Sequence, residues 1–159
     1  MRVLVDYPSE QDELGILYRM GGVRPSARPV LDPGRLAALQ TRARDVFVHH
    51  ALAEYVVRLV MATRDKIPEL AYGASPRATL GLVAAARALA LLRGRDYVLP
   101  GDIVDIAPDV IAHRLVLSFD AAADGVAPES IVRRIVDAVP LPLIAPTQES
   151  TGPGLGIAA

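Results

Sequence analysis

The hydrophobic residues of the chain recur mostly at helical spacing. The clearest stripe occupies positions i, i+3, i+4, i+7 and i+8 of one segment and consists of Leu52, Tyr55, Val56, Leu59 and Val60. Shorter stripes follow Ser9, Asp32 and Pro128. Apolar residues on one helix face are stable only when another element covers them, so the pattern predicts amphipathic helices that pack together. We therefore expect an all-α fold, a small helical bundle.

Residues 75–93 are apolar on most of their circumference and rich in alanine. We expect this segment to be the central and most buried helix, with its alanines allowing close approach of its neighbours. Ser75 is a good N-cap, and Pro76 suits the first helical position because its missing N–H would have no intrahelical partner. Pro108 should interrupt a helix, so residues 101–114 are predicted to form two short helices, the second starting near Pro108.

The two ends of the chain differ from its middle. Residues 2–8 have the pattern of a short strand, and the helix after them opens with a capping box at Ser9. Glycines and prolines punctuate residues 21–31, which is typical of a linker. We expect three parts: residues 1–31, a helical segment over 32–145, and a disordered tail over 146–159 where Pro and Gly recur without periodicity.

Composition narrows the functional classes. The net charge of −1 creates no global field toward nucleic acid or an anionic membrane. The chain has no cysteine, which excludes disulfides and thiolate metal sites. The longest apolar window, 78–92, is interrupted by Arg87 and is too short to span a bilayer. A cytoplasmic protein with neither nucleic acid nor membrane as partner is the expectation.

The chain is also unusually apolar. Hydrophobic residues make up 52% of it, and the mean hydropathy is +0.31. One explanation is apolar surface that a neighbouring unit covers. The other is the high alanine content, because alanine raises hydropathy without needing burial. Composition alone does not choose between them.

Arg77 is the candidate binding residue. It lies in the first turn of the helix that Ser75 and Pro76 open, beside unpaired backbone N–H groups at the positive end of the helix dipole. Guanidinium and dipole together favour an anion, so the position suits a phosphate. The alternative is a solvated arginine on a well-capped helix.

Other polar residues carry weaker signals. The three histidines lack the converging ligands of a metal site, and His113 lies near a helix end where its ring can bond a free carbonyl. Asp102 and Asp105 share a helix face, but acidic residues early in a helix are favoured by its dipole alone. Exposed arginines could pair across a subunit interface, yet ordinary solvated faces are the simpler interpretation of Arg93, Arg95, Arg133 and Arg134. We expect no catalytic residue and no metal site in this chain.

The order of these segments resembles the C-terminal part of MoxR-type AAA+ ATPases. The resemblance rests on the run from Gly73 to Leu92, the segments 94–98 and 100–104 after it, and Met61-Ala62-Thr63-Arg64 before it. It implies that residues 2–20 are the last strand and helix of the ATPase core, that the helices after the linker include the lid domain, and that Arg77 is the sensor 2 arginine, which reaches the terminal phosphates of ATP. The chain departs from the family at Leu99, where a Ser or Thr cap is usual.

The same resemblance implies a larger protein that assembles into an oligomer. The intact protein would bind and hydrolyse ATP with magnesium as a ring, a hexamer, and act like a chaperone. Its lid would contact the ATPase core, neighbouring subunits and a client protein. A phosphate-binding loop needs glycines, a lysine and a following hydroxyl, and the chain's only lysine, Lys66, lacks these neighbours. We therefore expect this chain alone to hold no cofactor and to hydrolyse no ATP.

Two other functions remain open from the residues alone. A free-standing helical module could recruit a protein partner through its apolar surface. A helix-turn-helix DNA reader could use residues 101–114, although the neutral charge and the lack of a basic recognition helix argue against it.

Overall fold

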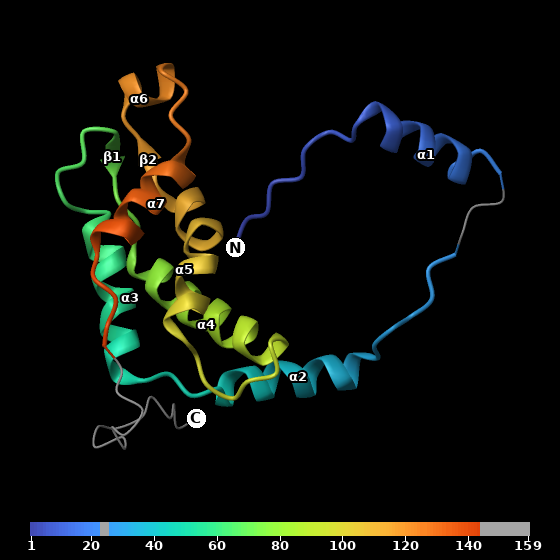
Figure 1. Cartoon of the computed structure of the whole chain (residues 1–159), viewed down its shortest axis with the longest axis horizontal. Helices are drawn as coiled ribbons and strands as arrows, with labels where there is room; N and C mark the ends of the chain where they lie inside the picture. Colours follow the sequence, from blue (N-terminus) through green and yellow to red (C-terminus); the bar gives the residue numbers. More distant parts are fainter. Residues whose placement is uncertain (23–25, 144–159) are drawn as a thin grey trace.

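A computed structural model describes residues 1–22 and 26–143. Helices dominate it, and they form a bundle with a short appended sheet (Figure 1). The elements in chain order are α1 (Glu10–Met20), α2 (Pro33–Asp45), α3 (His50–Ala62), β1 (Leu70–Tyr72), α4 (Pro76–Leu92), α5 (Pro100–Ile111), the 3₁₀ turn η1 (Ala112–Arg114), β2 (Val116–Leu117), α6 (Phe119–Ala123) and α7 (Pro128–Ala138). In the described residues, no helix has both the length and the apolarity to cross a membrane.

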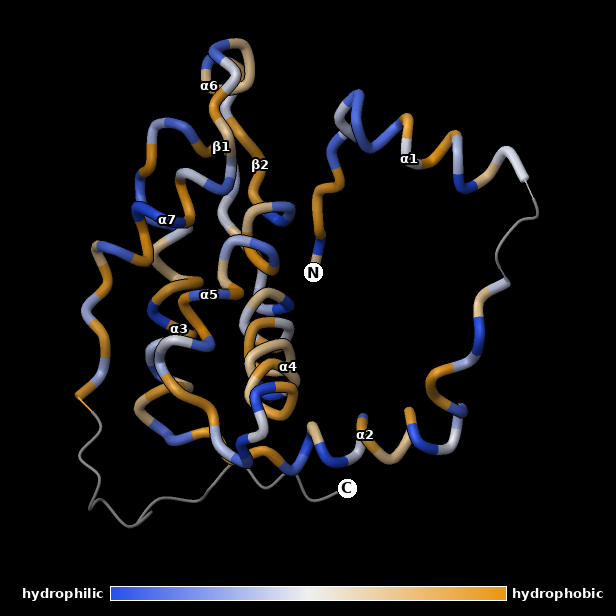
Figure 2. The backbone as a smooth tube through the Cα atoms, turned by 45° about the vertical axis from the view of Figure 1, so that its right-hand side comes forward, coloured by the Kyte–Doolittle hydropathy of each residue, from blue (hydrophilic) through white to orange (hydrophobic). Residues whose placement is uncertain are grey.

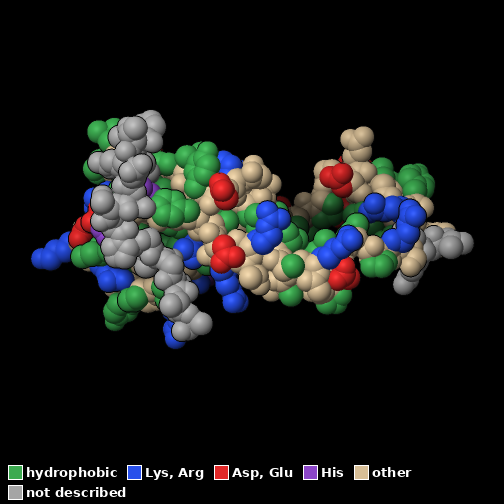
Figure 3. Space-filling view, turned by 90° about the horizontal axis from the view of Figure 1, so that it is seen from below, with side chains coloured by type: hydrophobic (Ala, Val, Ile, Leu, Met, Phe, Trp, Pro, Cys, Tyr) green, Lys and Arg blue, Asp and Glu red, His purple; other side chains and the backbone are tan. Residues whose placement is uncertain are grey.

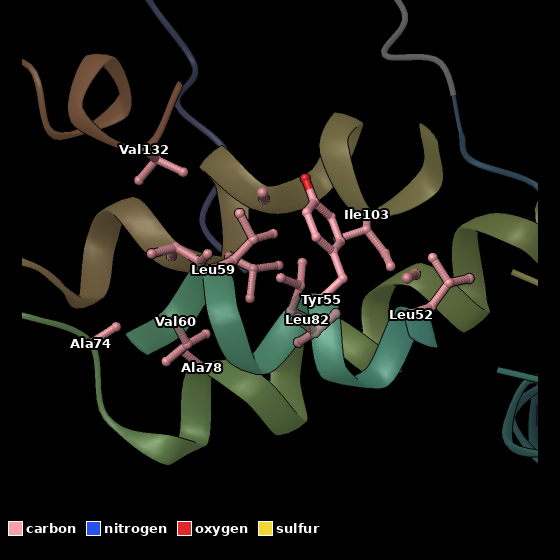
Figure 4. Close-up of a cluster of buried hydrophobic side chains, with 14 of the residues drawn as sticks. Leu52, Tyr55, Leu59, Val60, Ala74, Ala78, Leu82, Ile103 and Val132 are labelled. Atoms are coloured by element: carbon pink, nitrogen blue, oxygen red, sulfur yellow. The ribbon is translucent and has the colours of Figure 1, made fainter. Parts of the chain in front are cut away.

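The amphipathic stripe of α3 is the centre of the core. All five residues that its spacing singles out are at most 1% exposed. They pack against α4, α5 and α7. Figure 4 shows Tyr55 projecting from α3 toward Ile103 of α5. The stripe is therefore confirmed as a buried helix face.

Tyr55 places a hydroxyl in this apolar cluster. Its side chain is fully buried, and the oxygen has no hydrogen-bond partner among the described residues. Burial accordingly raises the pKa of Tyr55, and Arg58 and Asp137 add smaller and opposing electrostatic effects. An unpaired buried hydroxyl costs roughly 1–3 kcal/mol.

We expect Tyr55→Phe to leave the free energy of unfolding unchanged or to raise it by about 1 kcal/mol, because the ring is kept and an unpaired polar atom is removed. Urea denaturation followed by circular dichroism measures this. As a control, Tyr55→Leu should destabilise, since it removes ring volume from the core. A loss above about 1 kcal/mol for Tyr55→Phe would show that the hydroxyl has a partner.

Side-chain caps begin α1 and α2, the first of them at Ser9 as predicted. Asp12 and Ser9 exchange the bonds of a capping box, with the Asp12 N–H donating to Ser9 Oγ over 3.2 Å. The Asp32 carboxylate accepts from the Arg35 N–H, and Pro33 begins α2. Gly21 ends α1. Before α3, Phe47 forms a parallel bridge with Tyr97.

The N-terminal part stands apart from the bundle. Residues 1–9 adopt no regular secondary structure, and α1 has no buried residue. Figure 1 shows α1 away from the other helices. The short strand expected over 2–8 does not form, because a strand needs a partner ladder and this segment makes a single backbone bond, from the Arg2 N–H to Asp109 O.

Two expectations about the middle of the chain are wrong. Pro108 lies inside α5, which runs unbroken from Pro100 to Ile111. Val110 and Ile111, just beyond Pro108, are each 1% exposed. Burying two such side chains stabilises the continuous helix by about 3–6 kcal/mol, which offsets the roughly 3 kcal/mol that an internal proline costs.

The alanine-rich helix α4 is central but is not the most buried element. It contacts α2, α3 and α5, yet its buried face is the single row Ala78, Leu82, Ala86 and Ala90. Leu80 and Leu92 are 73% and 84% exposed. The neighbouring helices cover only part of the circumference of α4. Because α4 is apolar on most sides, some of its apolar side chains remain exposed.

A small sheet completes the fold and was not predicted. β1 and β2 pair antiparallel, with Leu70 opposite Leu117 and Tyr72 opposite Val116. After the sheet comes α6, and Gly125, at φ +70°, lies in the turn that leads into α7. Strands of two and three residues are too short to show alternation in a sequence. The tail over 146–159 lies outside the described residues.

Candidate functional site

Arg77 lies in the first turn of α4, where the sequence places it. The helix begins with Ser75 in an extended conformation and Pro76 at its first position. Ser75 occupies the N-cap but its side chain makes no capping bond, so the hydroxyl does not use up the free N–H groups of the first turn. The positive end of the dipole at this helix start is therefore not satisfied by a side-chain cap.

The Arg77 side chain points away from the protein core. The residue is exposed, whereas the next one, Ala78, is fully buried against the bundle. No described residue forms a hydrogen bond or ion pair with its guanidinium. Arg64, which lies just after α3, is instead held in place, because its Nε donates to Ala74 O over 2.9 Å. Arg77 is thus available to a ligand that approaches from outside the bundle.

A second charged cluster joins the other end of α4 to the start of α5. Asp102 is 1% exposed and accepts from both nitrogens of the Arg95 fork, at 2.7 and 2.6 Å. Arg93 donates to Asp102 over 2.8 Å and to Asp105 over 2.7 Å. The Leu99 N–H donates to the same buried carboxylate. The solvated-face interpretation of Arg93 and Arg95 is therefore wrong, because they are the partners of a buried charge.

Asp102 also explains how α5 starts without a Ser or Thr. Leu99 is the N-cap, and the carboxylate of Asp102, three residues on, accepts the Leu99 N–H over 2.8 Å. The Arg95 guanidinium in turn lies 5.9 Å from the ring centroid of Tyr97, within the range of a cation–π contact. The cluster therefore holds the α4–α5 connection in one geometry.

Stability should depend on pH through Asp102. Burial alone would raise the pKa of this carboxyl, but hydrogen bonds from Arg95, the Leu99 N–H and Arg93 outweigh it and lower the pKa below its usual 3.8. A carboxylate whose pKa is lower in the folded state than in the unfolded state stabilises the fold at pH values above the unfolded pKa. This contribution is lost as the pH falls through the folded pKa. We expect the difference in the free energy of unfolding between the wild type and Asp102→Ala to be constant around neutral pH and to become smaller below about pH 4. Urea denaturation at several pH values checks this, and a gap independent of pH down to pH 2 would contradict it.

The remaining candidates have local structural roles. His49 Nδ1 accepts the Ala51 N–H and so caps α3, while His50 lies 3.3 Å from Glu54. The His113 ring bonds Asp109 O over 3.1 Å, as its position near a helix end predicts. Arg134 pairs with Glu69 on the surface. In the part of the chain that the structure describes, no three His, Cys, Asp or Glu residues converge on a possible metal position.

Two surface features lie away from Arg77. A groove of about 940 Å³ runs between α2 and the end of α4, with Leu36, Leu39, Ala43 and Leu91 in its wall. Several large apolar residues are exposed on α1, including Leu14, Leu17 and Tyr18. Figure 2 shows apolar positions recurring along α1 and α2, and Figure 3 shows basic and acidic side chains interspersed over one face. Exposed apolar surface is thus present beyond what alanine explains.

Comparisons with known proteins agree with one another. Residues 61–135 match the family described as AAA lid domain. Chaperone MoxR1 of Mycobacterium tuberculosis is 50% identical over 151 residues, which are 90% of this chain and 40% of that protein. The uncharacterized protein YeaC of Bacillus subtilis is 36% identical over 144 residues, 89% of this chain and 45% of that protein. The chain thus spans less than half the length of these two relatives.

A solved structure shares the fold. The crystal structure of a "putative ATPase" from Cytophaga hutchinsonii superimposes with a TM-score of 0.80 and 28% identity. The match covers 87% of this chain and 45% of that one. Because it covers so much of this chain, the shared fold extends well beyond the 61–135 match.

Proposed function

The chain corresponds to the C-terminal part, lid domain included, of a MoxR-family AAA+ ATPase, and from this premise we propose that Arg77 is its contribution to an ATP site. In the intact protein, Arg77 contacts the terminal phosphates of a nucleotide that the ATPase core holds. The observation that carries the proposal is the exposed, unpaired guanidinium of Arg77 in the first turn of α4. Steady-state ATP hydrolysis by the full-length protein carrying Arg77→Ala tests it.

The residues of this chain fit one part of a nucleotide site. A guanidinium has five donors and matches phosphate oxygens in a bidentate manner. The neighbouring backbone N–H groups add a positive partial charge at the same helix end. ATP with magnesium supplies the phosphoryl group and most of the charge neutralisation when it is bound. Arg77 would stabilise the negative charge that develops on the transferred phosphoryl oxygens, so it should affect turnover more than binding.

The division of the chain follows from this assignment. Residues 1–31 would be the end of the core and a linker, and residues 32–145 the helical segment and lid. The separation of α1 from the bundle supports this division (Figure 1). The apolar side chains exposed on α1 then belong to a surface that the rest of the core covers.

We further propose that the intact protein works as a ring, a hexamer, in the cytoplasm and remodels a client protein. The name of the mycobacterial relative, a chaperone, supports the remodelling role. Movement of the lid against the core would transmit the state of the nucleotide, because the two parts meet at the arginine. This chain alone would not hydrolyse ATP.

A stand-alone interaction module remains the second candidate, because apolar side chains are exposed on several helices. It predicts that the chain binds a protein partner whether or not nucleotide is present. The ATPase assignment predicts instead that contacts made by the lid change with the nucleotide state of the core. A binding assay of the full-length protein with ATP, ADP and no nucleotide separates the two.

A further inference from the structure

The start of α4 is tied to the end of α3 by a small set of contacts. We call Thr63, Arg64, Gly73 and Ala74 the α3–α4 junction. Thr63 is 1% exposed, and apart from Tyr55 with its hydroxyl, Thr63 and Asp102 are the only buried polar or charged residues in the described part of the chain. Buried polar groups are nearly always hydrogen-bonded, so the partners of the Thr63 hydroxyl show what this residue does in the fold.

Thr63 bonds in two directions. Its Oγ1 donates to Val60 O over 2.6 Å, within its own helix end, and accepts the Ala74 N–H over 2.9 Å. Arg64 Nε donates to the carbonyl oxygen of the same Ala74 over 2.9 Å. The N–H and C=O of Ala74 belong to successive peptide units, so the two bonds orient both peptide planes that precede Ser75.

Gly73 allows the chain before α4 to pass in direct contact with the backbone at the end of α3. A Cβ atom at this position would lie 2.2 Å from Thr63 O and 2.6 Å from Thr63 C. These are backbone atoms at the end of α3 and cannot rotate away, so the chain passes directly against that end only because residue 73 has no side chain. Ala74, next along, is itself 1% exposed, and Figure 4 labels it at the margin of the buried cluster.

The junction therefore connects the best-buried helix of the core to the helix that carries Arg77. The α3 stripe is fixed by burial, and Thr63 and Arg64 lie immediately after α3. Arg77 follows Ala74 by three residues, through a proline that restricts the backbone further. We propose that Thr63, with Arg64 and Gly73, is a positioning residue that sets where the Arg77 guanidinium meets the nucleotide. This inference rests on the proposed role of Arg77.

The test uses the full-length ATPase and a pair of substitutions at one position. Thr63→Val keeps the shape but loses the hydroxyl, whereas Thr63→Ser keeps the hydroxyl. We expect Thr63→Val to lower kcat by about tenfold with little change in KM for ATP, because a small displacement of a catalytic group is costly. Thr63→Ser should restore most of the rate. Melting curves show that each variant is folded at the assay temperature.

A double variant separates positioning from general damage. In an Arg77→Ala background, Thr63→Val should have no further effect on kcat, because the group that it positions is gone. As a matched control, Ile131→Val removes buried volume from α7 and should lower the melting temperature with kcat unchanged. The inference would be overturned if Thr63→Val lowered kcat by the same factor in the wild-type and Arg77→Ala backgrounds. It would also be overturned if Ile131→Val lowered kcat as much as Thr63→Val does.

Two further results complete the test. If Thr63→Val does not fold, Arg64→Lys serves instead, since it keeps the charge but lacks the Nε–H that bonds Ala74 O. We expect it to lower kcat by about threefold, and an unchanged kcat would contradict the junction's role. A normal rate for Arg77→Ala contradicts the proposed function itself, whereas a slow Arg77→Ala with a fully active Thr63→Val contradicts only the positioning role.

Discussion

The role proposed for Arg77 predicts that Arg77→Ala in the full-length protein lowers the rate of ATP hydrolysis by on the order of 10²-fold and changes nucleotide affinity much less. The reason is that the transferred phosphoryl group gains charge on its oxygens in the transition state, and a fixed donor aimed there lowers the barrier more than it strengthens binding. Steady-state hydrolysis measures the first quantity, and titration with a fluorescent nucleotide measures the second.

Two variants make this result specific. Arg77→Lys keeps the positive charge but loses the planar fork, so it should recover only part of the rate. Arg133→Ala removes an exposed arginine from α7 and should leave hydrolysis unchanged. An unchanged turnover in Arg77→Ala would show that this arginine does not act on the nucleotide, and the interaction-module alternative would then be favoured.

Asp102→Ala should destabilise the chain by about 3–5 kcal/mol, the largest stability effect that we expect of any single substitution here. The substitution leaves Arg95, which is only 19% exposed, without its bidentate partner. It also leaves the Leu99 N–H at the start of α5 without its acceptor. Urea denaturation followed by circular dichroism gives the free energy of unfolding directly.

Asp105→Ala is the matched control. Asp105 binds the same Arg93 from the same helix face, but its side chain is 52% exposed. An exposed ion pair contributes about 0–1 kcal/mol, so this variant should be nearly as stable as the wild type. Similar decreases in the free energy of unfolding for Asp102→Ala and Asp105→Ala would mean that the burial of Asp102 does not determine how much this cluster stabilises the protein.

The local pattern of the sequence was enough to predict several elements. The α3 stripe was predicted from spacing alone, because five large apolar residues on one helix face leave few other ways to be covered. The starts of α1 and α2 were predicted because Ser9 and Asp32 act through bonds to residues three positions away. Arg77 was a candidate because proline and the N-cap define the helix start within three residues.

Other features depend on residues that are distant along the chain. Pro108 interrupts a helix only when packing does not offset its cost, and the α7 residues that bury this part of α5 lie more than twenty positions later. The exposed side of α4 depends on how many helices surround it. Sequence shows apolar residues on every side but not which sides have neighbours.

What the sequence by itself determined is the buried stripe of α3, the starts of α1 and α2, and the place of Arg77 at the start of α4, since each depends on interactions within one or two turns. The tertiary structure alone decided that Asp102 is the buried partner of Arg93 and Arg95, and that Thr63 holds the start of α4. Both arrangements join residues seven or more positions apart by side-chain hydrogen bonds. A hydrogen bond leaves no periodic trace in a sequence, so only the folded chain shows which polar groups meet.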